Sequence, residues 1–299
     1  MTARRGAHNR ATSPEEGVES AGTMGAHVIA RRRKPPNRML RRTPMRFAAP
    51  ALVCACLVGS ADRAAAYRPF DGTDAAVADL GELEIEFQPA GVIRSPSTTQ
   101  VAGPNAIFNY GFAERWELVL QTVAQGFPAD AGPMNVPNGA FLKYVLKPGV
   151  LQDQPGVSVA TEFGPVFANF GGSGTGFSWA GIVSQRWDWG TVHFNADANL
   201  TPDQRAEGFL DVIIEGPIKW MVRPVMEIYS DTVVNQTQTY SALVGAIWQV
   251  NDRLSFDMAV RYALVNGREV NEIRAGLTFG FPLNFGQPAS ATSPRRDVR

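Results

Sequence analysis

Residues 254–264 read Leu-Ser-Phe-Asp-Met-Ala-Val-Arg-Tyr-Ala-Leu, and every second residue from Leu254 onward is apolar. The residues between them are small or charged. Side chains alternate between the two faces of a β-strand, so this period of two predicts a strand with one apolar and one polar face. The same alternation recurs at 192–200, 272–281 and 82–88. No long stretch carries the apolar stripe of an amphipathic helix, so we expect an all-β protein.

About twelve segments of this kind follow one another, each near the ~10 residues that a tilted membrane-spanning strand needs. They cover residues 82–93, 104–112, 115–125, 139–148, 156–168, 176–187, 190–200, 207–216, 218–230, 238–250, 253–264 and 270–282. An even number of strands is typical of a single antiparallel up-and-down transmembrane β-barrel. Alternation alone also fits a soluble β-sandwich, whose strands have one buried and one solvated face.

The expected connections differ in length on the two sides. After even-numbered segments they are tight, at 113–114, 188–190, 216–217 and 251–252, with a Pro/Gly turn at 148–155; after odd-numbered segments most are longer, at 94–103, 126–138, 169–175, 201–206, 231–237 and 265–269. Short turns on one side and longer loops on the other are the pattern of bacterial outer-membrane barrels. Both chain ends would then emerge on the short-turn side, at the periplasm.

Aromatic residues recur near the ends of these segments. They are Trp116, Trp179, Trp187, Trp189, Trp220, Tyr229, Tyr240, Trp248 and Tyr262. Amphipathic rings favour the boundary between lipid and water, so we expect them to form the two aromatic girdles of the barrel. Closure into a barrel would also satisfy every backbone polar group within the lipid, which an open sheet cannot do.

The first 66 residues have the features of a targeting region. Arginines at 41, 42 and 46 precede an uninterrupted run of apolar and small residues at 47–59, and Ala64-Ala65-Ala66 follows. This order predicts a secretory signal peptide at 39–66, cleaved after Ala66. Residues 1–38 are interpreted as a disordered extension or a mis-assigned start, and residues 286–299 as a disordered C-terminal tail. Lipid attachment at Cys56, as in a lipoprotein signal, is the alternative to cleavage after Ala66.

Charge is divided unequally along the chain. Residues 1–66 carry 12 of the 28 Lys and Arg but only 4 of the 28 Asp and Glu, so the exported part is acidic. An acidic domain has no basic face for nucleic acid, and we expect no nucleic-acid partner. Both cysteines lie before residue 67. The exported part therefore has no thiol for a disulfide, a cysteine nucleophile or a thiolate metal site.

The polar faces of the strands would line the barrel interior, or lumen. The candidate lumen-lining residues for transport are Glu84, Glu86, Glu117, Lys143, Glu162, Arg186, His193, Asp197, Arg223, Glu227, Asp257, Arg261, Glu272 and Arg274. Together with their inward-facing neighbours, acidic side chains outnumber basic ones, which favours cations and neutral solutes over anions. In a narrow barrel these charges could instead pair across strands and plug the bore.

His193 is the one histidine after residue 66, and it shares a strand face with Asn195. A hydrolase site would need a nucleophilic serine beside it, yet no serine lies on its strand, and Ser184 lies on the neighbouring one. One histidine without cysteines also makes a zinc site unfavourable. We therefore expect no enzyme activity, no metal and no cofactor.

Short motifs resemble a known family. Arg68-Pro69-Phe70, the pattern Tyr110-Gly111-Phe112 leading into 114–118, and the ending 274–281 are similar to the start, first hairpin and closing strand of the "MetA-pathway of phenol degradation" family of Gram-negative outer-membrane transporters. The resemblance of layout covers most of residues 67–285. It implies porin-like passage of small organic solutes, hydrophobic and aromatic ones included, across the outer membrane.

Three hypotheses about function follow. In the first, residues 67–285 form an outer-membrane barrel that is a passive channel, with outer-membrane lipid, the barrel assembly machinery and a small-molecule solute as its partners. In the second, the barrel is plugged and has a structural or adhesive role, binding a partner through its loops. In the third it is an outer-membrane hydrolase that depends on His193.

Overall fold

The computed structural model describes residues 68–123, 138–168 and 172–283. The extension, signal peptide and cleavage site expected within residues 1–66, and the tail expected at 286–299, lie outside these residues. Within them the chain is almost entirely β-strand, with one short 3-10 helix, η1 (Val150–Gln152). No helix in the described part is long and apolar enough to cross a membrane.

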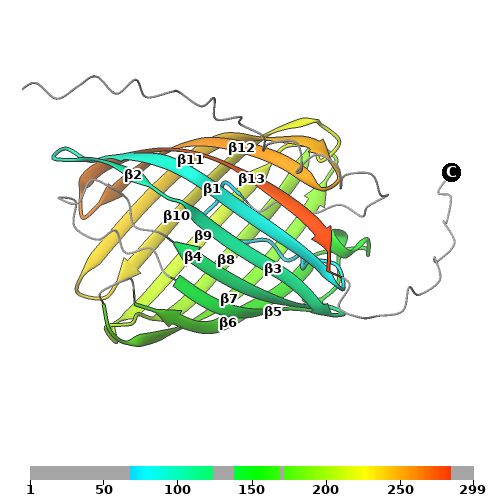
Figure 1. The fold of residues 1–299 in the computed structure, drawn as a ribbon, viewed down its shortest axis with the longest axis horizontal. Coiled ribbons are helices and arrows are strands. Elements are labelled where there is room, and N and C mark those ends of the chain that lie inside the picture. The colour runs from blue at the N-terminus through cyan, green and yellow to red at the C-terminus, as the bar shows by residue number, and fades with distance from the viewer. Residues whose placement is uncertain (1–67, 124–137, 169–171, 284–299) are drawn as a thin grey trace, which may run out of the picture. The chain divides into compact units, whose positions relative to one another are not determined.

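Thirteen strands form one antiparallel sheet among the described residues. They are β1 (Glu82–Arg94), β2 (Thr99–Ala102), β3 (Asn105–Ala113), β4 (Trp116–Val123), β5 (Asn138–Lys147), β6 (Ser158–Phe167), β7 (Thr175–Trp187), β8 (Gly190–Leu200), β9 (Ala206–Glu215), β10 (Val222–Val233), β11 (Thr237–Asn251), β12 (Leu254–Val265) and β13 (Arg268–Pro282). β1 pairs with both β2 and β3, each strand from β3 onward pairs with the next in sequence, and β13 pairs with β1, so the sheet closes (Figure 1).

The barrel wall is twelve strands around, because β2 and β3 occupy successive lengths of the same partner. β2 pairs with Gly91–Arg94 and β3 with Leu83–Gln88, both on β1. Only Gly103 and Pro104 interrupt them. The expected closed, twelve-stranded, antiparallel barrel is therefore confirmed.

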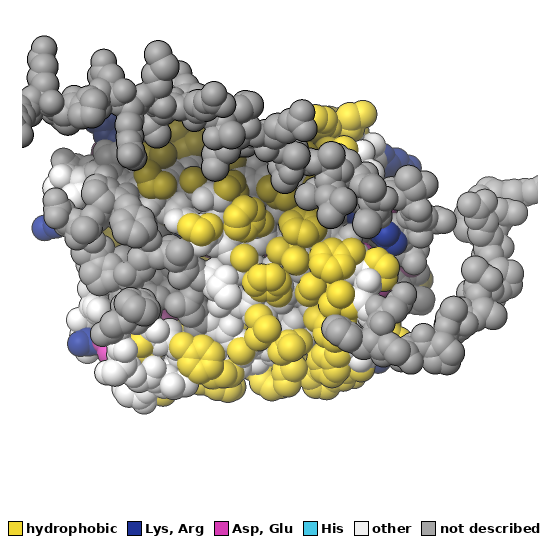
Figure 2. Space-filling model, in the orientation of Figure 1, with side chains coloured by type: hydrophobic (Ala, Val, Ile, Leu, Met, Phe, Trp, Pro, Cys, Tyr) yellow, Lys and Arg dark blue, Asp and Glu magenta, His cyan; other side chains and the backbone are white. Residues whose placement is uncertain are grey.

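The period of two in the sequence separates the two faces of the wall. On β12, Phe256, Met258 and Val260 point outward and are exposed, whereas Ser255 and Asp257 point inward and are buried. The described strands all belong to one closed sheet, so no second sheet covers the outward apolar residues. Figure 2 shows such side chains gathered over the middle of the wall. Contact with lipid stabilises an apolar belt of this kind, whereas its exposure to water is energetically unfavourable. The belt therefore favours the membrane barrel over the sandwich.

Most of the expected girdle aromatics lie on the outside. Trp179, Trp187, Trp189, Tyr240, Trp248 and Tyr262 are exposed large side chains, whereas Trp220, also exposed, lies between β9 and β10 and lines the lumen cavity. Trp187 and Trp189 stack on each other at the turn between β7 and β8, with ring centroids 5.4 Å apart. The expectation of a girdle position is wrong for Tyr229. Its position on β10 points the side chain into the lumen, where its hydroxyl accepts a hydrogen bond from Arg261.

Three of the expected long loops are shorter than the sequence indicated. Residues 99–102 form β2, so the first loop is only 95–98; β10 and β11 extend to leave 234–236; and the last connection is the two-residue turn Asn266-Gly267. Both turn residues have positive φ, 50° and 76°, the conformation of a tight hairpin turn. The polar residues at these positions were expected in loops, but they pair in register with neighbouring strands. A barrel strand can extend beyond the lipid-facing belt because its polar face lines the lumen.

The chain before the first strand does not leave the barrel directly. β1 and β13 do begin and end at the same rim, where Glu82 lies opposite Pro282. We call this the terminal rim, and the opposite one the distal rim. Residues 68–80, called the inner segment below, instead lie inside the lumen and bond to the wall. The expectation that both ends simply emerge at one rim is thus wrong for the described N-terminal stretch.

Candidate functional site

The lumen contains one large cavity in the described structure. Its volume is about 2180 Å³, and both the wall and the inner segment line it. Trp220 and Asn251 from the terminal rim contribute to its lining, as do Pro202 and Gln236 from the distal rim. The cavity therefore reaches from one end of the barrel toward the other, alongside the inner segment.

The structure places most of the candidate lumen residues at the wall of this cavity. These are Glu84, Glu86, Glu117, Lys143, Glu162, Arg186, His193, Asp197, Arg223, Arg261 and Arg274. Glu227, Asp257 and Glu272 also point inward but are buried beneath other groups. Glu227 and Asp257 bond to the inner segment, and Glu272 bonds to two arginines. These three belong to the packing of the lumen rather than to its open surface.

Wall side chains hold the inner segment by its backbone. Because the segment pairs with no strand over most of its length, its buried N–H groups need other acceptors. The bonds are Asp71 N and Gly72 N to Glu227 Oε1 (2.7 and 2.9 Å), Thr73 N to Asn195 Oδ1 (3.2 Å), Ala75 N to Ser184 Oγ (3.0 Å), and Ala78 N to Glu117 Oε2. Four strands, β4, β7, β8 and β10, thus provide the acceptors along the inner segment, which together we call the docking track.

Carbonyl groups of the segment are held as well. Arg274 Nη1 donates to the carbonyl of Pro69 at 3.0 Å, and Gln152 Nε2, from η1, donates to that of Ala75 at 2.8 Å. The one 3-10 helix therefore has a role inside the barrel. It helps to fasten the segment where it passes the terminal rim.

Two inward-facing glycines make room for the segment. A Cβ at Gly111 on β3 would collide with the carbonyl oxygens of Ala78 and Asp79, and one at Gly276 on β13 would collide with the side chain of Arg68. A larger residue at Gly111 would therefore have to displace the backbone of the segment, and one at Gly276 would have to move the Arg68 side chain. Such close backbone approach is one of the reasons a strand contains glycine.

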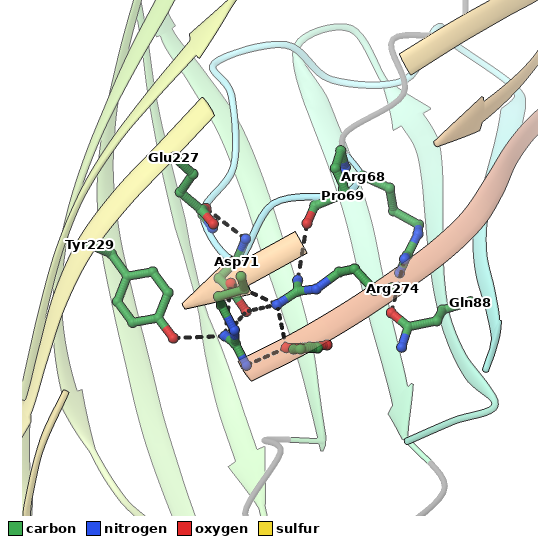
Figure 3. Close-up of polar contacts among 10 residues, drawn as sticks. Arg68, Pro69, Asp71, Gln88, Glu227, Tyr229 and Arg274 are labelled. Carbon is green, nitrogen blue, oxygen red and sulfur yellow. Dashed lines mark hydrogen bonds and ion pairs between the residues drawn. The ribbon is translucent and has the colours of Figure 1, made fainter. Parts of the chain in front are cut away.

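Two arginines meet on the carboxylate of Asp71 (Figure 3). Arg261 Nη1 and Arg274 Nη2 each lie 3.1 Å from Asp71 Oδ2. Both arginines also pair with Glu272 on β13, and Arg261 donates a 2.8 Å hydrogen bond to the hydroxyl of Tyr229. The result is a network of two cations and two carboxylates, in which one carboxylate comes from the segment.

The charge state of Asp71 follows from these neighbours. Burial alone would raise the pKa of the Asp71 carboxyl, but the guanidinium groups of Arg274 and Arg261 outweigh it and lower the pKa to about 2. Asp71 is therefore ionised at neutral pH.

Other charges of the segment are also paired with the wall. Arg68 lies 3.3 Å from Asp257 Oδ2 and donates to Gln88 Oε1 at 2.9 Å. Lys143 on β5 lies 3.5 Å from Asp74 Oδ1 and donates to the hydroxyl of Thr73 at 3.0 Å. The segment and the wall thus neutralise each other around the bore.

The lumen near the distal rim is more acidic. Asp197, Glu207 and Asp231, on three successive strands, line the cavity there, with Glu162 deeper along the wall. In the described part of the chain no ion pair joins Asp197, Glu207 or Asp231 to a Lys or Arg. Carboxylates gathered without counter-charges attract cations and repel anions.

The structure brings a serine to the predicted histidine. Ser184 Oγ lies 2.8 Å from His193 Nδ1, His193 Nε2 lies 3.3 Å from Glu215 Oε1, and Arg223 pairs with the other oxygen of Glu215 at 3.3 Å. The side-chain types match a Ser-His-Glu triad. Ser184 is, however, 0% exposed, and its oxygen accepts the N–H of Ala75. The arrangement docks the segment, and a substrate carbonyl has no access to the serine.

Sequence reasoning missed the inner segment and the role of Ser184, Asn195 and Gln88 in docking it. Two signals were present. The polar stretch 71–74 precedes the first strand without belonging to it, and glycine occupies inward positions on β3 and β13. In the described residues, no group of three or more His, Cys, Asp or Glu side chains is placed to hold a metal ion.

No protein-family model matches this chain, and no curated protein matches it either. Solved structures similar to it are outer-membrane β-barrel channels. The KdgM porin is 12% identical with a TM-score of 0.44, and the match covers 67% of this chain and 99% of that one. The COG4313 outer membrane channel from Pseudomonas putida F1 is 10% identical with a TM-score of 0.47, covering 71% and 100%. The CymD monoaromatic hydrocarbon channel is 10% identical with a TM-score of 0.34, covering 69% and 89%. The likeness concerns the fold alone.

Proposed function

We propose that this protein is a passive channel of the bacterial outer membrane for small organic solutes, and that it admits cations and neutral molecules better than anions. The observation that carries the proposal is the cavity of about 2180 Å³, whose lining includes residues of both rims. A barrel with an apolar belt outside and a polar cavity inside is the architecture of a membrane pore. Lipid and the barrel assembly machinery are its proposed partners, and a small solute its cargo.

The preference against anions rests on the lining of the lumen. Around the inner segment Arg261, Arg274 and Lys143 are paired with carboxylates, whereas Asp197, Glu207 and Asp231 near the distal rim have no basic partner among the described ion pairs. We therefore expect the electrostatic potential to be negative in the distal part of the bore. Uptake of hydrophobic or aromatic compounds is the finer proposal, and the resemblance to the MetA-pathway family supports it.

Liposome swelling and planar-bilayer conductance test the channel. Purified protein is expected to conduct ions and to let small neutral solutes into liposomes, with potassium more permeant than chloride. A neutral aromatic alcohol and a sugar of similar size would show whether aromatic compounds pass faster. Protein that forms a heat-modifiable barrel but shows no conductance above that of protein-free membranes would contradict the proposal.

A plugged barrel with a structural or adhesive role is the second candidate, and one observation favours it. The inner segment lies within the bore and is bonded to the wall by its backbone. The absence of conductance would favour this candidate. Membrane insertion itself is tested by extraction with carbonate and by gel mobility with and without boiling, since a soluble protein would be released and would show no mobility shift.

A further inference from the structure

We propose that Asp71, carried into the lumen by the inner segment, sets the ion selectivity of the channel by masking Arg261 and Arg274 from passing anions. The proposal rests on the proposed channel function and names the residue that determines its specificity. Asp71, Arg261 and Arg274 all line the cavity, so passing solutes meet them directly.

Asp71 is the more exposed of the two carboxylates that pair with these arginines. Both arginines contact its Oδ2 at 3.1 Å, and both also contact Glu272. The Asp71 side chain is 29% exposed, whereas that of Glu272 is 5% exposed and does not reach the cavity lining. From the lumen, two guanidinium groups are therefore covered by one accessible carboxylate. Loss of that carboxylate would leave a net positive, anion-attracting site at this level.

The electrostatics support a large effect. The low pKa of Asp71 keeps its carboxylate charged throughout the neutral range. A unit charge at the wall of a narrow, partly desolvated pore changes the local potential by several kT, because there is little water to screen it. The distal acidic residues attract cations into the bore, but they lie on other strands and do not contact these arginines.

The backbone bonds of the docking track allow the charge of Asp71 to be removed while the segment stays in place. The backbone N–H groups of Asp71 and Gly72 bond to Glu227, and the carbonyl of Pro69 bonds to Arg274. These bonds do not need the Asp71 side chain. Asp71→Asn is nearly the same size and is therefore expected to change the charge at this position while the segment stays docked.

The experiment measures the ratio of potassium to chloride permeability from the reversal potential of the full-length, exported protein in planar bilayers under a KCl gradient. Asp71→Asn is expected to lower this ratio about threefold or more. The double variant Asp71→Asn with Arg261→Gln, which removes one positive charge again, is expected to restore most of it. Glu269→Gln, which removes an exposed carboxylate from outside the cavity lining, is the matched control and should leave the ratio as in the wild type.

Asp231→Asn removes a lumen carboxylate that pairs with no arginine in the described structure, and it should change the ratio less than Asp71→Asn does. An equal or larger effect would overturn the assignment of Asp71, and so would a conducting Asp71→Asn variant with unchanged selectivity. Boiled and unboiled gel mobility shows whether each variant folds. If Asp71→Asn fails to fold, Arg261→Gln alone must raise the ratio for the proposal to stand. A wild type without conductance would instead refute the channel function itself.

Discussion

The backbone N–H of Ala75, in the inner segment, donates a 3.0 Å hydrogen bond to the hydroxyl of Ser184 on the barrel wall. The serine in turn contacts His193, so a strand residue that could have been a nucleophile is a fastening point for the chain inside the barrel. This bond is representative of the lumen. Buried polar side chains of the lumen provide hydrogen-bond partners for the backbone of the inner segment, which forms no continuous strand pairing with the wall. This role explains why acidic residues are present in the bore, where burying a charge without a partner would be energetically unfavourable.

Loss of the Ser184 hydroxyl should destabilise the barrel. Ser184→Ala leaves the Ala75 N–H and a buried imidazole nitrogen without this partner, and an unsatisfied buried polar group costs about 1–3 kcal/mol. Thermal unfolding, followed by the loss of the unboiled gel band, should shift to lower temperature. Ser178→Ala, farther along the same strand toward the distal rim, is the control and should behave nearly as the wild type. Equal melting of the two variants would contradict the docking role.

A side chain at Gly111 should displace the inner segment while leaving the wall paired. In Gly111→Ala the new Cβ would collide with the carbonyl oxygens of Ala78 and Asp79, both of which belong to the segment. A cysteine introduced by Thr73→Cys would report the change, since its labelling by a soluble thiol reagent should become faster. Conductance should rise in parallel.

The matched control for this experiment is Gly208→Ala, because a Cβ at Gly208 would meet no atom within 4 Å. Labelling in that background should equal labelling in the parent. If Gly111→Ala left both labelling and conductance unchanged, the close packing of the segment against β3 would be refuted.

Acid should weaken the docking of the segment only at low pH. The folded pKa of Asp71 is about 2, below its ordinary value of 3.8, so its carboxylate contributes stability that is complete above the ordinary value and is lost as pH falls through the folded one. The wild type should exceed Asp71→Asn in stability by ~1–2 kcal/mol near neutral pH, with the gap closing between pH 4 and pH 2. Denaturant melts at several pH values measure it. A gap that closed above pH 5 would contradict the ion pairs with Arg261 and Arg274.

A charge on the outer belt should prevent stable insertion. Val260 on β12 is exposed on the lipid-facing side, and an arginine near the middle of such a belt costs about 2–4 kcal/mol. Val260→Arg is therefore expected to lower the yield of heat-modifiable barrel in liposomes. Gln121→Arg adds the same charge at a residue that lines the cavity, and it should insert normally. Equal insertion of both variants would mean that Val260 does not face lipid.

Much of the barrel could be read from residues such as Phe256, Met258 and Val260, because the faces of a strand follow from a period of two and no partner is needed to see it. A tight turn was predicted at 188–190, and the structure places it at 188–189. The Asn-Gly pair at 266–267 is also a strong local turn signal, yet the expected loop covered 265–269.

The candidate functional site, like the fold, could be predicted only in part. Arg261 and Glu227 were predicted to face inward, since parity along a strand determines the face, and the structure places them there. That Arg261 pairs with Asp71, and that Glu227 accepts two N–H groups of the inner segment, did not follow from the pattern. Those contacts join residues 190 and 156 positions apart along the chain.

By itself, the sequence determined which side of each strand meets lipid and which meets the lumen, because alternation is a property of neighbouring residues. Only the tertiary structure decided what fills the lumen. Closure of β13 on β1 creates the interior space, and a polar stretch with no ladder of its own can enter it only where wall side chains and small residues such as Gly111 receive it. This requirement involves residues that are far apart along the chain, so no local sequence pattern encodes it.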